Sequence, residues 1–178
     1  MIVLSAGHTP KRPGARSGDL KEHTLNVNCM HQLAIQLITA GYPVVILDPL
    51  LTLQQKIDLC AARYPKALCI DIHHNAFNGK AEGAEVYYKV GDKRSFDLGS
   101  HLLRHTSEAL GLRCRGMKLA KQSARGSLGW LRITNSLLWE VCFMDNPNDL
   151  PKGEPGAWAK AFVEAVKNYT GDLDWIKG

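Results

Sequence analysis

Short apolar runs alternate with longer segments of helical periodicity along this chain, and this alternation limits the possible fold more than any other feature. Strand-like runs occur at 2–5, 43–47, 67–72, 83–88 and 137–143. Segments with an apolar residue at every third or fourth position occur at 22–40, 52–63, 95–110 and 156–169. Strands that are apolar at nearly every position are covered on both faces, which is typical of parallel sheets. The sequence therefore predicts an α/β fold, with a mostly parallel twisted sheet of about five or six strands and helices on both faces.

The bulk properties fit a single domain. No repeat, low-complexity tract or linker interrupts the 178 residues, so we expect one domain over 1–178. No apolar run approaches the roughly 20 residues that span a bilayer, and we expect no integral membrane association. The first eight residues lack the basic segment of a signal peptide, which predicts a protein made and held in the cytoplasm.

The net charge bears on the binding partner, and the cysteine count bears on the redox state of the thiols. The net charge of +5 favours an anionic partner such as nucleic acid, a membrane surface or a cell wall. The basic residues are dispersed, with modest clusters at 11–16 and 113–125, and they do not form the aromatic-interleaved stripe of a nucleic-acid binder. We therefore expect no nucleic-acid partner. The five cysteines are odd in number and include no Cys-x-x-Cys pair, which indicates buried, reduced thiols.

Candidate metal ligands lie where predicted strands end. His8 follows the first strand, and the pair at 73–74 follows the third. Ligands of parallel α/β sheets bind outside the carboxyl ends of the strands. Two imidazoles and one carboxylate form the ligand set of a catalytic zinc that keeps a position for water, and Glu22 is the candidate carboxylate. The period of two in a strand separates His73 from His74 without choosing between them.

Glu22 also has a structural interpretation. The segment Asp19-Leu-Lys-Glu22 matches a capping box, with Asp19 as the N-cap of the following helix. A carboxylate in the first turn of that helix also points back towards the preceding loop, which contains His8. The two roles share one geometry, and the sequence leaves both open.

Glu140 stands inside the apolar run at 136–143. A carboxylate buried there must be paired, associated with a metal or protonated, because an isolated buried charge is very costly. One possibility is an ion pair with a core-facing arginine such as Arg132. Beside an activated water, Glu140 would instead act as a general base with a raised pKa.

A competing metal motif lies on a predicted helix. His101 and His105 are spaced as metal ligands, with Glu108 one turn further on. The motif lacks the internal glutamate of His-Glu-x-x-His and lies in mid-helix, so we expect the catalytic site elsewhere.

Four segments stand in an order and spacing that resemble one enzyme family. Ile2-Val-Leu-Ser-Ala-Gly-His8 is followed by Gly14-Ala15, and Glu22 comes fourteen positions after His8. Asp71-Ile-His-His-Asn-Ala76 and Leu138-Trp-Glu-Val-Cys-Phe-Met-Asp-Asn146 complete the set. Together they resemble the motifs LDAGHGG…GA, SIHxNA and LVExGFxxN of zinc-dependent N-acetylmuramoyl-L-alanine amidases of the Amidase_3 type. The resemblance runs from residue 1 to about residue 170.

This resemblance implies a site and a reaction. It favours His73 over His74, so that His8, Glu22 and His73 would hold one Zn²⁺ and Glu140 would be the catalytic residue. The reaction would be cleavage of the amide bond between N-acetylmuramic acid and L-alanine in peptidoglycan. The chain would then be one catalytic amidase domain without a separate wall-binding module.

The sequence departs from the family motifs beside the proposed site. Thr9-Pro10 replaces the usual glycines, Asp71 replaces a serine, His74 replaces a small residue and Cys142 replaces a glycine. Asp71 or Asn75 is placed to orient His73. Asn75, Arg132 and the loop at 118–127 are the candidates for substrate binding.

The resemblance also suggests a biological role. We expect a monomeric, bacteriolytic enzyme similar to a phage endolysin, with an open site, which stays in the cytoplasm until it is released to the cell wall. A zinc peptidase or carboxypeptidase that cuts the stem peptides is one alternative, because it would share the metal and the base. A non-catalytic wall-binding module is the other.

Overall fold

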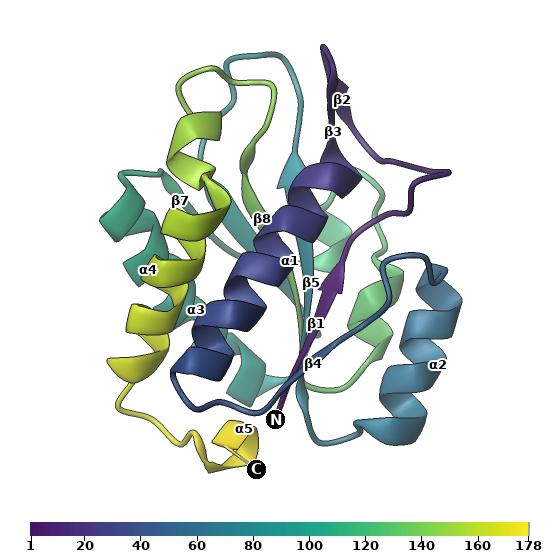
Figure 1. Cartoon of the computed structure of the whole chain (residues 1–178), viewed down its shortest axis with the longest axis vertical. Helices are drawn as coiled ribbons and strands as arrows, with labels where there is room; N and C mark the ends of the chain where they lie inside the picture. The colour runs from purple at the N-terminus through teal and green to yellow at the C-terminus, as the bar shows by residue number, and fades with distance from the viewer. Residues whose placement is uncertain (178) are drawn as a thin grey trace.

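A six-stranded sheet forms the centre of the computed structural model, which describes residues 1–177 (Figure 1). Its strands lie in the order β4-β1-β5-β8-β6-β7. Their bounds are β1 Ile2–Ala6, β4 Val44–Ile46, β5 Leu68–Asn75, β6 Ala84–Tyr88, β7 Cys114–Leu119 and β8 Ser136–Phe143. The first four strands in this order are parallel, whereas β6 runs antiparallel to β8 and β7 runs parallel to β6. The predicted mostly parallel sheet is confirmed.

Helices cover both faces of the sheet, as predicted. On one face, α1 (Glu22–Thr39), α3 (Lys93–Leu110) and α4 (Pro155–Lys167) enclose the larger core. On the other face, α2 (Leu53–Arg63) and the short 3-10 segment η2 (Gly129–Arg132) cover a smaller core. The remaining short segments are η1 (Ala120–Gln122), η3 (Leu150–Gly153) and α5 (Asp174–Lys177). Alternate residues of each central strand enter the two cores, which explains why these strands are apolar throughout.

Local signals set the helix ends close to their predicted positions. Thr52 and Gln55 form a capping box at the start of α2, and Asp92 caps α3 by accepting a hydrogen bond from the Ser95 backbone N–H. Gly111 ends α3 with a φ of 62°, a left-handed conformation that suits glycine. These polar and glycine residues fix the helix ends before any packing is considered.

Three strands were not predicted. The segment at 114–119, which lies in the basic cluster at 113–125, is the edge strand β7. Between His8 and Glu22, β2 (Arg16–Ser17) and β3 (Leu20–Lys21) form a small antiparallel hairpin. None of these three strands has an unbroken apolar run, because all three lie at the surface, where polar residues are tolerated.

All five cysteines are free; Cys114 is exposed and the other four are buried. Among residues 1–177, no helix combines the length and the apolar character that crossing a membrane requires. The expectation of one domain extends to Gly178, which lies outside the described residues, and it stays a prediction.

Candidate metal centre

His8 is held beside His73 by glycine at the end of β1. The Gly7 backbone N–H donates to the Ile72 carbonyl at 2.8 Å, which continues the pairing of β1 with β5. A Cβ atom on Gly7 would lie 2.3 Å from the His73 imidazole, so a larger residue would displace that ring. The next residue, His8, has a φ of 67°, which is unusual for a residue other than glycine. The chain therefore turns sharply where β1 ends, and the turn carries the first imidazole.

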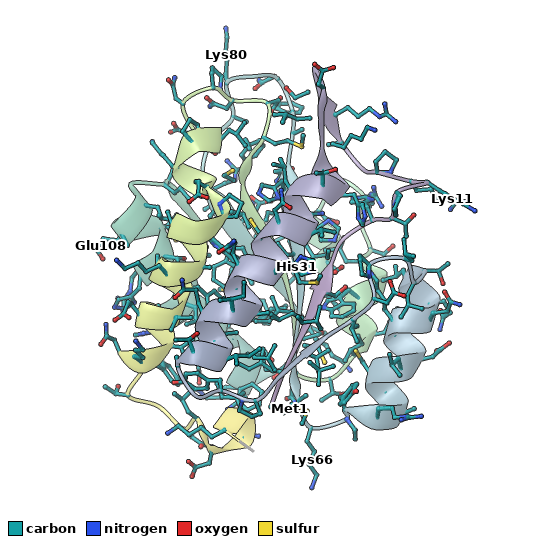
Figure 2. All side chains as sticks on the ribbon, viewed as in Figure 1. Met1, Lys11, His31, Lys66, Lys80 and Glu108 are labelled. Carbon is teal, nitrogen blue, oxygen red and sulfur yellow. The ribbon has the colours of Figure 1, made fainter. Side chains whose placement is uncertain are left out.

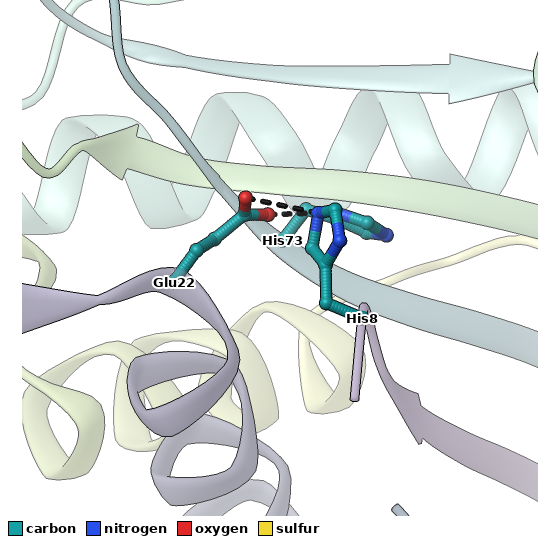
Figure 3. A group of neighbouring side chains, drawn as sticks. All are labelled: His8, Glu22 and His73. Carbon is teal, nitrogen blue, oxygen red and sulfur yellow. Dashed lines mark hydrogen bonds and ion pairs between the residues drawn. The ribbon is translucent and has the colours of Figure 1, made fainter. Parts of the chain in front are cut away.

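Glu22 is the first residue of α1, and its two carboxylate oxygens point towards the two imidazoles (Figure 3). Its Oε2 atom is 2.9 Å from His8 Nε2, and its Oε1 atom is 2.8 Å from His73 Nδ1. The Ala15 backbone N–H also donates to Oε2 at 2.9 Å. Burial alone would raise the pKa of Glu22, but hydrogen bonds to His73 and His8 outweigh it and hold this pKa below its ordinary value.

The capping interpretation of Glu22 is wrong. The N-cap of α1 is Lys21, in an extended conformation and without a side-chain hydrogen bond, and Asp19 lies in the turn between β2 and β3. The hairpin occupies the positions that a capping box would need. The Glu22 carboxylate is therefore directed to the histidines and to the loop before them.

Gly14 completes the enclosure of this carboxylate. Its φ of +76° is in the left-handed region, and a Cβ atom there would lie 2.2 Å from Glu22 Oε2 and 2.5 Å from His8 Cδ2. A side chain would thus occupy the space of two candidate ligands. This contact gives a physical reason for the glycine in the Gly14-Ala15 motif.

The three side chains form a group that can hold a metal ion. One ligand atom each from His8, Glu22 and His73 lie within 4.8 Å of one another. Two imidazoles and a carboxylate suit a catalytic Zn²⁺ that leaves a fourth position open. Among residues 1–177, no other group of three or more His, Cys, Asp or Glu side chains has a geometry that could hold a metal ion. The donor set therefore fits a metal ion.

His73, and not His74, supplies the second imidazole. The His74 side chain lies on the opposite face of β5, where its Nδ1 atom is 2.8 Å from Asn26 Oδ1. His73 also contacts Asp71, with 3.0 Å between His73 Nε2 and Asp71 Oδ2. Burial alone would lower the pKa of His73, but the Asp71 charge and hydrogen bonds to Asp71 and Glu22 raise it well above its ordinary value. Asp71 thus fixes the ring orientation that turns Nδ1 towards Glu22.

Glu140 lies beside His73 on the neighbouring strand. The register pairs His73 on β5 with Glu140 on β8, so both side chains lie on the same face of the sheet. The Glu140 Oε2 atom is buried and has no hydrogen-bond partner among residues 1–177. Burial raises the pKa of Glu140 to about 8, and the neighbouring carboxylates of Glu22 and Glu85 add to this effect against the opposing influence of His73. A carboxyl group with a free oxygen and raised basicity suits proton transfer.

The proposed ion pair between Glu140 and Arg132 is wrong. Arg132 lies in η2, where its guanidinium donates to Gln54 Oε1 at 2.7 Å and to the Gly129 carbonyl at 3.3 Å. Its side chain is exposed on the surface of the smaller core. The role of Arg132 in substrate binding stays a prediction.

Glu85 is a site residue that the sequence analysis missed. It pairs with Glu140 across β6 and β8 and is 3% exposed. Its carboxylate accepts hydrogen bonds from Arg115 and Lys118, which lie on β7, and from Tyr87 at 2.8 Å. These donors keep the pKa of Glu85 below its ordinary value although burial would raise it. Its place in the apolar run at 83–88 is the same signal that identified Glu140.

Asn75 belongs to this network. Its amide donates a hydrogen bond to Glu85 Oε1 at 3.1 Å. Asn75 therefore links the end of β5 to the carboxylate next to Glu140. Its predicted contact with substrate stays a prediction.

The alternative motif on α3 is engaged elsewhere. His101 Nε2 lies 2.9 Å from the Ala165 carbonyl, and His105 Nδ1 lies 2.9 Å from the His101 carbonyl. Glu108 is exposed at the surface of the helix. Contacts with the backbone within α3 and to α4 account for this pair without a metal ion.

A family model described as N-acetylmuramoyl-L-alanine amidase, Amidase_3, matches residues 2–169. The chain belongs to this family. The match includes the three candidate ligands and Glu140, and it confirms the resemblance seen in the motifs.

One curated relative is also described as an amidase. An uncharacterized cell wall amidase of Bacillus anthracis is 34% identical over 118 residues, which are 61% of this chain and 21% of that protein. The chain thus spans about a fifth of the length of this curated relative. Because the relative is much longer, the comparison concerns one part of it.

Two solved structures share the fold. Cwp6 from Clostridium difficile has a TM-score of 0.79 at 24% identity, over 96% of this chain and 29% of that chain. The catalytic domain of CwlV, an N-acetylmuramoyl-L-alanine amidase from Bacillus (Paenibacillus) polymyxa var. colistinus, has a TM-score of 0.76 at 21% identity. The latter match covers 94% of this chain and 96% of that domain. At these identities the likeness establishes the α/β fold.

Proposed function

We propose that this protein is a zinc hydrolase that cleaves the amide bond between N-acetylmuramic acid and L-alanine in peptidoglycan. The observation that carries the proposal is the position of Glu140. Its unpartnered carboxylate oxygen lies beside a group of two imidazoles and one carboxylate. Family membership supports the proposed substrate class, and the geometry supports the proposed ligand set and base.

The metal would be held by His8, Glu22 and His73. When bound there, Zn²⁺ would lower the pKa of a water molecule and polarise the scissile carbonyl. Asp71 accepts a hydrogen bond from His73 Nε2, so Nδ1 is the nitrogen that would serve as a ligand once a bound cation displaced its proton. The negative charge of Glu22 is compatible with a cation at this position.

Glu140 would move the proton. It would accept a proton from the attacking water and deliver it to the nitrogen of the leaving L-alanine, because a carboxyl group with a raised pKa both accepts and returns a proton near neutral pH. Glu85, neutralised by Arg115 and Lys118, would keep the neighbouring strand in place without adding a free acid. The products would be a glycan strand and a free stem peptide.

We further propose that the cleavage is bacteriolytic, as for a phage endolysin that remains in the cytoplasm until release. The lytic role is supported by the solvent accessibility of the candidate metal centre. The side chains of His8 and His73 are 16% and 14% exposed, and both line an open groove. Chloroform-permeabilised bacteria treated with zinc-loaded protein should lose turbidity within minutes. Intact turbidity, with purified peptidoglycan still cleaved, would contradict the lytic role alone.

Product analysis tests the reaction. Purified peptidoglycan is digested with the zinc-loaded wild type, with Glu140→Gln and with Glu108→Gln as a surface control, and the fragments are analysed by mass spectrometry. We expect free stem peptides that begin at L-alanine from the wild type and the control, and none from Glu140→Gln. Fragments cut within the stem peptide would indicate a peptidase. Stoichiometric zinc without any cleavage would indicate a wall-binding module.

A further inference from the structure

A groove of about 790 Å³ opens directly beside the candidate metal centre. His8 and His73 are among its lining residues. Three segments form its walls: the turn at 9–12, the region at 50–53 where α2 begins, and the loop at 125–129. Trp130 and Leu138 provide part of an apolar floor, and both are buried. A substrate whose scissile bond reaches the metal centre would therefore extend one of its two halves along this groove.

The side chains that line the groove are mainly positively charged. Four basic residues line it: Lys11, Arg12, Lys56 and Arg125. Among the described lining residues, Asp71 is the one acid, and it is buried against His73 and near Lys56. The Lys56 ammonium is itself engaged with the Ala6 carbonyl at 2.6 Å. The other three cations, Lys11, Arg12 and Arg125, are exposed, and among the described lining residues no further carboxylate neutralises them.

The turn that carries two of these cations is well defined. Thr9 and Arg12 exchange backbone hydrogen bonds of 3.2 and 3.0 Å, and the Arg12 N–H also contacts Thr9 Oγ1 at 3.3 Å. Lys11 lies at the tip of this turn and projects outwards, as Figure 2 shows. The turn occupies the position where the sequence departs from the glycines of the family motif.

The two halves of the proposed substrate differ in charge. The N-acetylmuramoyl glycan has no ionised group once its lactyl carboxyl is in the scissile amide. The stem peptide carries free carboxylates beyond L-alanine unless these are amidated. We propose that the groove binds the stem peptide and that Lys11, Arg12 and Arg125 select stems with free carboxylates over amidated stems. This inference rests on the proposed amidase function and adds substrate selectivity to the same site.

The test compares two substrates that differ only in charge. They are N-acetylmuramoyl-L-alanyl-D-glutamic acid and the same compound with both carboxyls converted to amides. We expect the zinc-loaded wild type to prefer the acid by about tenfold in kcat/KM, mainly through KM, since each exposed ion pair contributes modestly. The preference should fall as salt is raised, because exposed charges are screened.

Charge-matched variants identify the residues responsible. The triple variant Lys11→Gln, Arg12→Gln, Arg125→Gln should lose the preference, so that its kcat/KM for the acid no longer exceeds its kcat/KM for the diamide. The control triple variant Lys66→Gln, Lys80→Gln, Lys160→Gln removes the same charge at exposed positions outside the lining of the groove, and it should keep the preference. Figure 2 shows Lys66 and Lys80 at opposite ends of the molecule. Loss of the preference in both triple variants would assign it to net charge and overturn the inference.

A binding measurement separates this inference from the proposed reaction. Calorimetric titration of Glu140→Gln with each compound reports on the groove without turnover. Tighter binding of the acid supports the inference even if neither compound is cleaved, in which case the amidase proposal alone fails. Equal cleavage and equal binding of the two compounds would overturn the inference and leave the amidase proposal standing.

Discussion

Glu140 should destabilise the metal-free protein at alkaline pH, and Glu140→Gln should remove this cost. The pKa of Glu140 is raised from 4.5 to about 8, mainly by burial. In this pH range the folded state binds a proton that the unfolded state has released, so the stability of the wild type falls as pH rises from about 4.5 to 8. The full shift corresponds to roughly 5 kcal/mol, and partial hydration of a side chain that is not fully buried reduces the expected loss to about 2–3 kcal/mol.

The assay is urea unfolding in the presence of a chelator, at pH 5 and at pH 9. Glu140→Gln should gain about 2–3 kcal/mol relative to the wild type between the two pH values. The comparison between pH values cancels any change in packing that the substitution causes. Glu108→Gln, on the surface of α3, controls for the loss of one carboxylate. An equal effect of Glu140→Gln at both pH values would refute the argument that this carboxyl group is held in its neutral form.

Three further predictions concern the metal centre. Gly14→Ala should weaken zinc binding at least tenfold in calorimetry, because its Cβ would collide with Glu22. The control Gly18→Ala has a similar positive φ but open space around it, so it should lose only about 1–2 kcal/mol of folding stability and bind zinc normally. Equal zinc affinities in the two variants would contradict this packing effect. Asp71→Asn should lower zinc affinity by about 10- to 100-fold, because the amide holds the imidazole of His73 less well; unchanged affinity would exclude the orienting role. Zinc at a thousandfold excess over its Kd should stabilise the wild type by about 4 kcal/mol in thermal or urea unfolding, and a chelator should reverse this gain; a melting curve indifferent to zinc would argue against the site.

The fold could be predicted from the sequence for the strands that are buried on both faces of the sheet. The central strands are apolar at nearly every position because each face packs against helices, and this pattern is visible without a structure. The edge strand β7 was missed because it is only partly buried and carries Arg115, Gly116 and Lys118. Edge strands are stabilised by pairing with a neighbour, and pairing leaves little trace in composition.

The site was predictable in its residues but not in its contacts. Glu140 could be identified because a carboxylate within an apolar strand needs a partner or a function. Its position beside His73 depends on the register of β5 and β8, which no local pattern encodes. The Asp19 capping box failed for the same kind of reason, since the β2–β3 hairpin takes up the chain just before α1. Glu85 needed the same argument as Glu140, and its two cations come from the strand that was missed.

The most direct test of the central claim is a single experiment on zinc binding and turnover by Glu140→Gln. Zinc stoichiometry and affinity are measured in the same sample as the rate at which new L-alanine amino termini appear from an N-acetylmuramoyl-L-alanyl peptide. We expect one zinc per chain, an affinity within about threefold of the wild type, and a rate reduced by about 10²- to 10⁴-fold, because the base is lost while the ligands remain. Turnover near the wild-type rate with zinc bound would contradict the role of Glu140, and loss of zinc would place Glu140 among the ligands.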